Sequence, residues 1–295
     1  MKATRLAAET LRVLPRKRLS KMFGVAAAAH VPAAMLARAI DVYVRAYDVD
    51  LTECDVPPGG WPTFNAFFTR ALRDGLRPID DDPDILVSPA DGRVEDSGPI
   101  DANAAFLVKG KRYEVGELLG DPADAARFEG GRFAIVYLSP RDYHRVHAAV
   151  EGEVHTVRHV GGTLFPVNRI GLEHIAGLFA KNERVAVFQT SPTHGEVATI
   201  LVGAIVVGGI KLRFEPSLRT NAGPGRGTIR YVAGLRPFLR RGEELGRFEL
   251  GSTVIVLTTK ESAVEFSFEA GRSVKVGEAL ARAHHAESSA NSRGA

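Results

Sequence analysis

The stretch FELGSTVIVL (residues 248–257) lies close to the C-terminus and places a Gly-Ser pair between two strand-like runs. β-Branched side chains dominate residues 253–257, and residues 247–250 alternate polar with apolar, so both flanks predict strands. Glycine accepts backbone geometries that other residues resist. Attack by the Ser252 hydroxyl on the Gly251 carbonyl would convert the amide into an ester and could break the chain there. The simpler interpretation is a bend or bulge between strands.

A serine hydroxyl is a weak nucleophile and needs a base, usually a histidine that a carboxylate orients. Two upstream segments offer such groups: SPADGRV (residues 88–94) and LSPRDYHRVH (residues 138–147). Asp91, His147 and Ser252 have the right chemistry, but their separation in sequence says nothing about distance. His144 and His147 form an HxxH pattern that could also indicate a metal, although no nearby Cys or matching Asp/Glu pattern completes a ligand set. Ordinary core or surface histidines are the remaining alternative.

Four segments decide between these alternatives, namely PADGRV (89–94), LSPRDYHRVH (138–147), GGTLFPVN (161–168) and ELGRFELGSTVIVL (244–257). In this order and spacing they resemble the phosphatidylserine decarboxylases of the bacterial and mitochondrial type. The resemblance extends to FNAFFTR (64–70) and FLVKG (106–110), and so covers nearly the whole chain. The LGST and DYHRVH elements are specific, whereas PADG alone would be weak.

The resemblance implies a self-processing proenzyme. In that family the serine of LGST attacks the preceding glycine carbonyl, the ester breaks by β-elimination, and the new N-terminus loses ammonia to become a pyruvoyl group. Carried over to this chain, cleavage falls between Gly251 and Ser252 and leaves a large β chain (1–251) and a small α chain (252–295). His147 would remove the Ser252 proton, while Asp91 would hold the imidazole in its useful tautomer.

The resemblance also implies the second reaction and the partners. The pyruvoyl ketone, derived from Ser252 and needing no metal, would form a Schiff base with phosphatidylserine and release CO2 to give phosphatidylethanolamine. His144 is a candidate for substrate positioning or proton return, with His147 as the alternative proton donor. Phe165, Pro166, Val167 and Asn168 are expected beside the substrate. The processed protein would be a heterodimer of β and α chains, with pairing of two heterodimers left open and no nucleic-acid partner.

Positive charge is concentrated at the N-terminus. Residues 1–21 hold seven Lys or Arg against Glu9, which gives +6, so with +3 for the whole chain the other 274 residues carry −3. Basic residues alternate there with apolar ones at helical spacing, interrupted by Pro15. Such a helix suits an anionic membrane surface; the alternative is a helix that packs its apolar stripe on the body. We expect peripheral attachment at the cytoplasmic face of the cell membrane, with no spanning segment, and the single cysteine, Cys54, fits a reducing compartment.

The fold class predicted is α+β and predominantly β, with N-terminal amphipathic helices followed by a β-sandwich or barrel-sandwich-like catalytic body. We expect a helical, membrane-associating region over residues 1–56, a β-rich catalytic domain over 57–283 and a disordered tail over 284–295. Thr63 is a plausible N-cap for a helix through about residue 72. Short strands with turn residues between them follow from residue 85, with helical interruptions at about 114–120 and 171–180. Residues 271–280 resemble the strand-turn of biotinyl and lipoyl carriers, which we interpret as shared architecture.

Two other function classes remain open at this stage. A serine hydrolase could use Asp91, His147 and Ser252 in an uncleaved chain, but residues 251–253 lack the G-x-S-x-G elbow. A non-catalytic peripheral membrane-binding module would use the Gly-Ser pair only as a turn. Replacement of Ser252 by alanine separates these alternatives, because only a self-processing enzyme loses a chain cleavage.

Overall fold

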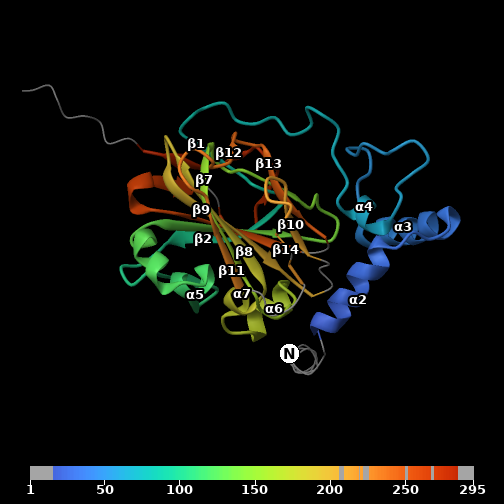
Figure 1. Ribbon diagram of the computed structural model, residues 1–295, viewed down its shortest axis with the longest axis horizontal. Helices are drawn as coiled ribbons and strands as arrows, with labels where there is room; N and C mark the ends of the chain where they lie inside the picture. The colour runs from blue at the N-terminus through green and yellow to red at the C-terminus, as the bar shows by residue number, and fades with distance from the viewer. Residues whose placement is uncertain are drawn as a thin grey trace, which may run out of the picture.

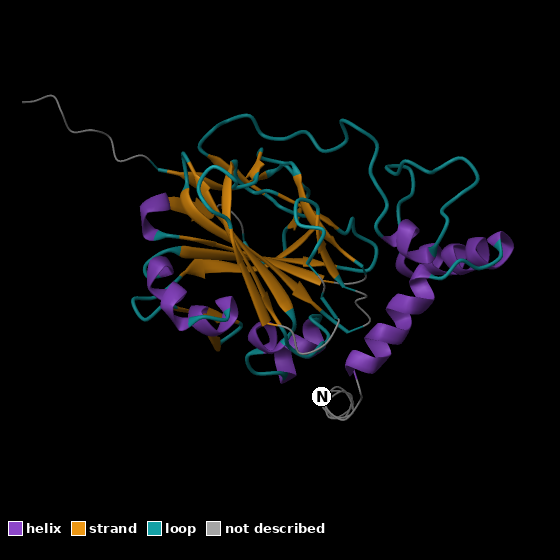
Figure 2. Ribbon diagram, viewed as in Figure 1, coloured by secondary structure: helices purple, strands orange, loops and turns teal. Residues whose placement is uncertain are grey.

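The structure is a computed structural model that describes residues 16–205, 209–218, 220–221, 226–249, 252–266 and 269–284. It is mostly β, with α-helices at the N-terminus and along one side of the sheets (Figures 1 and 2). This confirms the predicted fold class, although the described strands form no closed barrel. Residues 1–15 and 285–295 lie outside the described residues, and with them most of the predicted basic segment and all but His284 of the predicted disordered tail.

A nine-stranded antiparallel sheet forms the centre of the molecule. Strand β14 (Ser252–Thr258) lies in its middle and pairs on one side with β5 and on the other with β9. The sheet runs in the order β11 (Arg226–Arg230), β7 (Gly152–Val160), β8 (Arg184–Ser191), β9 (Gly195–Gly203), β14, β5 (Arg132–Leu138), β2 (Gly92–Pro99) and β16 (Ser273–Val274), with β12 (Phe238–Leu239) pairing with β7.

Strand β14 is buried on both faces, which explains its continuous apolar run over residues 254–257. Val254 and Val256 point into one core and Ile255 and Leu257 into the other, as expected when side chains alternate across a strand. The predicted strand after Gly251 therefore contributes side chains to both hydrophobic cores of the sandwich.

Two three-stranded sheets cover the first face of the large sheet. Their strands are β10 (Ile210–Leu212), β13 (Glu244–Phe248) and β6 (Arg145–His147) in one, and β1 (Ile85–Val87), β17 (Ala279–Ala283) and β15 (Val264–Phe266) in the other. Inward-facing residues such as Val146, Ile210 and Phe248 join the core that contains Val254.

Short helices and a hairpin cover the second face. The elements are the hairpin β3 (Ala105–Val108) and β4 (Lys111–Glu114), helices α5 (Val115–Leu119), α6 (Arg169–His174) and α7 (Leu178–Lys181), and the 3-10 turn Pro122–Phe128; a second 3-10 turn, Lys260–Ser262, follows β14. The helix predicted over 171–180 is broken because Gly177 adopts a left-handed conformation with φ of 63°. The strand β6 was not predicted, since only three residues of a polar motif form it.

Three helices lie to one side of the sandwich (Figure 1): α2 (Arg16–Ala28), α3 (Ala33–Tyr47) and α4 (Phe64–Phe68). Thr63 caps α4 as predicted, since its hydroxyl accepts a hydrogen bond from the Ala66 amide, but the helix ends at Phe68, earlier than expected. Phe67 packs with the buried face of α3. In the described part of the chain, no helix is both long enough and apolar enough to cross a membrane.

Candidate active site

Ser252 is the first residue of β14 and lies opposite Leu138 of β5 and Gly203 of β9. It is almost completely buried, and its hydroxyl has no hydrogen-bond partner among the described residues. A buried polar group without a partner is uncommon in a native protein and needs an explanation. Gly251 and Leu250 lie outside the described residues, so the geometry of the bond before Ser252 is not part of the structure described.

The two upstream motifs, residues 88–94 and 138–147, are in direct contact. The His147 amide donates a hydrogen bond of 2.7 Å to the Pro89 carbonyl, which joins the DYHRVH segment to PADG. The Phe248 amide donates to the His144 carbonyl at 3.0 Å. Since Leu138 faces Ser252 at the end of the β14–β5 ladder and the chain then continues into residues 139–147, the three predicted segments lie at the same end of the central strands.

The imidazole of His147 is held at both nitrogens. Nδ1 lies 2.8 Å from the Gly242 carbonyl oxygen, which can only accept, so the neutral ring carries its hydrogen on Nδ1. Nε2 is therefore the unprotonated nitrogen, and its lone pair accepts a 3.1 Å hydrogen bond from the Tyr143 hydroxyl. Burial lowers the pKa of His147 below its ordinary value and outweighs the attraction of nearby acceptors and carboxylates. The ring is thus a neutral base at pH 7.

Asp91 is buried and ion-paired, but its described partners do not include His147. Its carboxylate accepts hydrogen bonds from Arg77 Nε at 3.0 Å and Nη2 at 2.5 Å, and from the Val276 amide at 2.8 Å. Arg77 also bonds Glu53 at 2.6 Å and lowers the pKa of that carboxyl to about 2. The tautomer of His147, which the resemblance assigned to Asp91, is set here by Gly242.

His144 occupies a different environment from His147. It is fully buried and stacks on Phe68 of α4, with 4.1 Å between ring centroids. Burial and the neighbouring Arg70 guanidinium lower its pKa to about 3, although the backbone of Ser139 and Pro140 favours the charged ring. Neither ring nitrogen meets the geometry of a hydrogen bond with a described residue. His144 is therefore a neutral ring whose polar neighbours are the backbone groups of Ser139 and Pro140.

The FPVN segment is tied to Ser252 through Asn182. The Asn182 side chain accepts a hydrogen bond from the Phe165 amide at 2.9 Å and donates to the Phe165 and Gly203 carbonyls, both at 2.8 Å. Gly203 is the strand partner of Ser252. Pro166 and Val167 follow in the same loop, and Asn168 begins α6 by accepting a hydrogen bond from the Gly171 amide. The segment predicted to lie beside the substrate is thereby held near Ser252.

Four residues of this arrangement were not predicted from the sequence. They are Arg77, Tyr143, Asn182 and Asp142, and the first three contact Asp91, His147 and Phe165 respectively. The Asp142 carboxylate accepts a 2.7 Å hydrogen bond from the Ser139 amide. Burial raises the pKa of Asp142. Tyr143 and Asp142 stand inside the DYHRVH motif, which was a usable signal. Arg77 and Asn182 lie in unremarkable stretches and offered none.

The described residues contain no group of His, Cys, Asp or Glu side chains that could hold a metal ion.

Comparison with known proteins gives consistent matches. A family model described as phosphatidylserine decarboxylase matches residues 64–282. A curated relative in Shewanella baltica, named phosphatidylserine decarboxylase proenzyme, is 42% identical over 91% of this chain and 94% of its own length. A relative of the same name in Shewanella loihica is 40% identical over 92% of this chain and 96% of its own length.

Proposed function

Because the chain belongs to the phosphatidylserine decarboxylase family, we propose that it is a proenzyme that cuts itself between Gly251 and Ser252 and then converts phosphatidylserine into phosphatidylethanolamine and CO2. The observation that carries this proposal is the Ser252 hydroxyl, buried without a described partner at the first position of the central strand. The Thr199 and Thr253 hydroxyls of the same sheet also lack a described partner, so what distinguishes Ser252 is its place directly after Gly251, at the strand end where segments 88–94 and 138–147 meet.

Self-cleavage begins when Ser252 Oγ attacks the Gly251 carbonyl carbon and its proton passes to His147 Nε2. The C–N bond then breaks, the nitrogen takes up a proton, and an ester joins the two segments. Loss of the Ser252 α-proton expels the Gly251 carboxylate by β-elimination, and hydrolysis of the resulting enamine releases ammonia. His147 suits the first step because Nε2 is unprotonated in the tautomer that Gly242 selects, and it can take the proton once its lone pair turns from the Tyr143 hydroxyl to Ser252.

Asp91 supports His147 by charge in this proposal. The carboxylate is fixed by Arg77 and the Val276 amide, and its negative charge favours the imidazolium that forms after proton transfer. Arg77 thereby acts as a positioning residue, since it touches Asp91 and not the reacting atoms.

The pyruvoyl group supplies a ketone that takes up the substrate amine and accepts the electron pair left when CO2 departs. The chain supplies surroundings of low polarity for that loss, since Phe165 and Val167 are buried near the Ser252 end of β14 and a desolvated carboxylate is lost more easily. His144 is neutral at pH 7 and can donate one hydrogen bond and accept another, which suits substrate positioning or proton return.

The two chains produced by cleavage stay folded together. The segment after residue 251 contributes β14, which lies between β5 and β9, and also β16 and β17, which pair with β2 and β1. A cut at Gly251 leaves all these ladders intact, so a β–α heterodimer results; pairing of two heterodimers is part of the proposal only as an open alternative.

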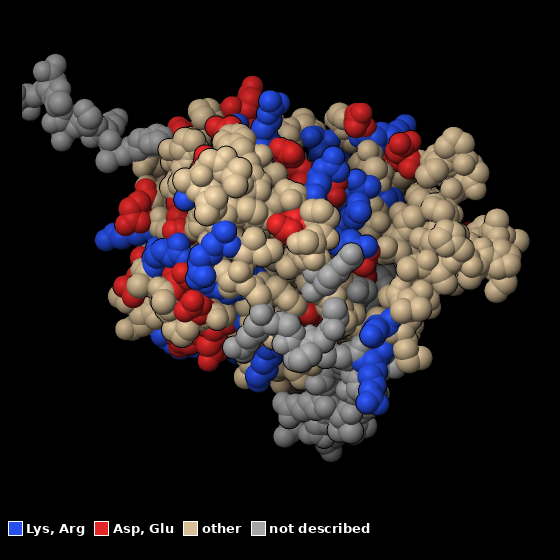
Figure 3. All heavy atoms as spheres, viewed as in Figure 1, with Lys and Arg blue, Asp and Glu red and all other residues tan. Residues whose placement is uncertain are grey.

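Peripheral attachment to the cytoplasmic membrane surface is proposed from the N-terminal helices. Met22, Phe23 and Val25 of α2 and Met35 and Val42 of α3 are exposed, with Met22 at 67%, and Arg18 and Lys21 of α2 are exposed beside them (Figure 3). Exposed apolar groups beside basic ones suit an anionic lipid surface. The Tyr43 hydroxyl of α3 donates to the Pro140 carbonyl at 2.9 Å, which links these helices to the candidate active site.

The test is decarboxylation by the purified protein with phosphatidylserine in neutral detergent micelles. We expect release of CO2 and formation of phosphatidylethanolamine by wild type and none by Ser252→Ala. Thr199→Val is the matched control, because Thr199 is another buried hydroxyl without a described partner in the same sheet, opposite Val256. Activity of the Ser252→Ala protein, or inactivity of a folded, cleaved wild type on this lipid, would contradict the proposal.

A further inference from the structure

Three cations lie in a row across the small sheet formed by β10, β13 and β6. Lys211 pairs with Arg247, and Arg247 pairs with Arg145 on its other side. Directly paired residues of antiparallel strands point to the same face, where like charges repel. The neighbouring residues Ile210, Val146 and Phe248 point to the core instead, so the row lies on the outer face of the sheet.

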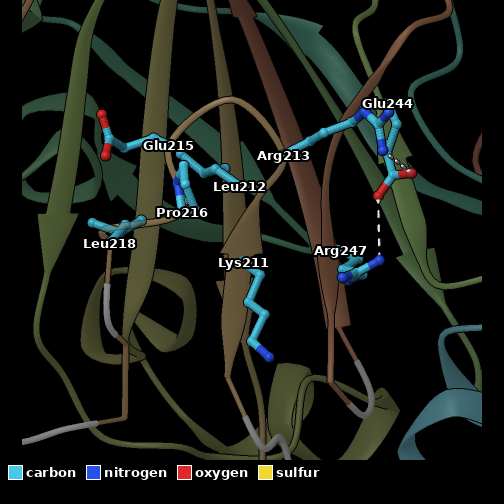
Figure 4. Close-up of a pocket in the computed structure, with 8 residues that line it drawn as sticks. All are labelled: Lys211, Leu212, Arg213, Glu215, Pro216, Leu218, Glu244 and Arg247. Atoms are coloured by element: carbon cyan, nitrogen blue, oxygen red, sulfur yellow. Dashed lines mark ion pairs between the residues drawn. The ribbon is translucent and has the colours of Figure 1, made fainter.

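The negative charge of the carboxylates around this row is smaller than the positive charge of the basic side chains. Glu244 lies 3.0 Å from Arg145, 3.8 Å from Arg247 and 4.0 Å from Arg213, so one carboxylate faces three guanidinium groups. Figure 4 shows Arg213 and Arg247 converging on Glu244 while the Lys211 side chain extends away from it. Lys211 forms its own pair with Glu249 at 2.5 Å. Among the described residues, the outer face of this sheet therefore keeps an excess of positive charge.

Beside the row is a cavity of about 450 Å³, which we call the basic groove. It lies between the small sheet and the segment that contains α4. Its charged lining residues are the four cations Arg70, Arg145, Lys211 and Arg247 and the two carboxylates Asp55 and Glu249. Its volume is within the range of small-molecule sites, roughly 300–1,000 Å³. Figure 3 shows Lys and Arg side chains gathered in a band between the sandwich and the N-terminal helices.

The wall of the basic groove also contains an unused donor. Arg70 is 4% exposed, and its Nε and Nη2 bond Cys54 and the carbonyls of Arg141 and Asp142. Its Nη1 is buried and has no partner among the described residues. The described partners of the Arg70 guanidinium are thus a thiol and two carbonyls, with no carboxylate among them, so its positive charge adds to that of the groove wall.

The basic groove adjoins the candidate active site. Glu249, which lines it, precedes Ser252 by three residues, a span of at most about 11 Å. Phosphorus and amine nitrogen are only a few bonds apart in a phosphoserine headgroup. A headgroup whose amine lies at Ser252 would therefore have its phosphate within the span that separates Ser252 from Glu249.

We propose that the basic groove is the anionic subsite of this enzyme, in which Arg247, Lys211 and Arg145 bind the phosphodiester of the phospholipid while its serine amine faces residue 252. The assignment rests on the proposed decarboxylase function. Guanidinium groups recognise phosphate oxygens through charge-assisted hydrogen bonds. Of the three cations, Arg247 is the best one to replace in a test of phosphate binding. Arg145 also donates to the Thr69 carbonyl and Lys211 is paired with Glu249, so their replacement would disturb other contacts as well.

The test compares Arg247→Gln with Arg240→Gln, an exposed arginine in the turn before β13 that does not line the groove. Initial rates are measured on phosphatidylserine in neutral detergent micelles, after intact mass has shown how far each protein is cleaved. We expect the KM of Arg247→Gln to rise about tenfold, with kcat per cleaved molecule changed less than about threefold, since one charge-assisted contact is lost. Arg240→Gln should match wild type, and Arg247→Lys should recover most of the loss. An Arg247→Gln KM equal to that of wild type would overturn the proposal.

A second measurement needs no variant and covers the case in which Arg247→Gln fails to cleave itself. Glycerophosphoserine should inhibit the wild type competitively, and more strongly than serine at equal ionic strength. Absence of that difference would overturn the subsite. Equal inhibition by inorganic phosphate would overturn its assignment to the headgroup and make it a site for free phosphate. A wild type that releases no CO2 from phosphatidylserine would instead mark failure of the proposed function itself.

Discussion

His144 and His147 are three residues apart, yet their surroundings are opposite. His147 has a partner at each ring nitrogen and lies near Asp91, whose carboxylate is itself fixed by Arg77. His144 is fully buried and stacks on Phe68, and although the backbone of Ser139 and Pro140 lies beside it, neither ring nitrogen has the geometry of a hydrogen bond with a described residue. The Ser252 hydroxyl shares this lack of a partner.

The contrast divides the site into two parts: a supporting side, which contains His147, Asp91 and Arg77, and a reacting side, which contains His144 and Ser252. On the His147 side, the polar groups are paired and fix one tautomer, as a general base requires. On the other side, the Ser252 hydroxyl is buried without a described partner and burial keeps the His144 ring neutral, so neither group is committed to a strong polar contact. We therefore expect His147 to serve self-cleavage and His144 to serve the reaction with the lipid.

The largest expected effect comes from replacing each of the two histidines and comparing cleavage with decarboxylation. In His147→Gln, self-cleavage should slow by about 10³-fold, because a positioned general base contributes roughly 10²–10⁴. In His144→Gln, cleavage should continue within about tenfold of wild type while decarboxylation per cleaved molecule falls by at least about 10²-fold. Gel or mass analysis of cleavage over time, together with CO2 release, measures both. The same loss of cleavage in both variants would end the division of roles.

The next effect concerns the ion pair that supports Asp91. Arg77→Met leaves a carboxylate that is only about 10% exposed without its bidentate partner, which should lower the free energy of unfolding by about 3 kcal/mol. Urea denaturation of the uncleaved Ser252→Ala background measures this. Adding Asp91→Asn should recover part of the loss, since the unpaired charge is then absent. A cost below about 0.5 kcal/mol for Arg77→Met would show that the pair does not hold Asp91.

The pH dependence of cleavage distinguishes the supporting side from an ordinary exposed histidine. Burial lowers the pKa of His147 below 6.5, so its ring remains neutral and basic somewhat below that pH. The cleavage rate should be level from neutral pH through 6.5 and fall only at lower pH. A half-maximal rate at or above pH 6.5 would contradict the burial of this base.

The free energy of unfolding should depend on pH through His144, over a wider pH range than the cleavage rate does through His147. The pKa of His144 is about 3 when folded and about 6.5 when unfolded. Below pH 6.5 the unfolded chain binds more protons, so this histidine lowers the free energy of unfolding as the pH falls towards 3. His144→Gln in the Ser252→Ala background should flatten that slope in urea titrations, whereas an unchanged slope would place His144 in water.

The smallest effect concerns Tyr143. Tyr143→Phe removes the hydroxyl that donates to His147 Nε2 but leaves the Gly242 contact that fixes the ring. Cleavage should therefore change by less than about tenfold, the equivalent of one ordinary hydrogen bond. A loss as large as that of His147→Gln would make the Tyr143 hydroxyl part of the proton path.

The sequence predicted the features that depend on local pattern. The β-branched run after Gly251 predicted β14, and the side-chain oxygen of Thr63 predicted the start of α4. The motifs also indicated which segments would meet, and the Pro89–His147 contact bears out one such meeting. The individual side-chain partners were beyond reach, because they depend on contacts across the fold. Arg77 meets Asp91 only after the loop from residue 70 crosses the body, and Asn182 meets Phe165 across two loops.

The central claim is that Ser252 consumes itself to make the reacting group, and intact-mass spectrometry of purified wild type beside Ser252→Ala tests it most directly. The account predicts two wild-type chains divided between residues 251 and 252, with the small chain lighter by one ammonia than a peptide that begins with serine. Ser252→Ala should give one full-length mass, and the Thr199→Val control should divide like wild type. A single full-length mass for the folded wild type, or a small chain that retains its serine, would contradict the account.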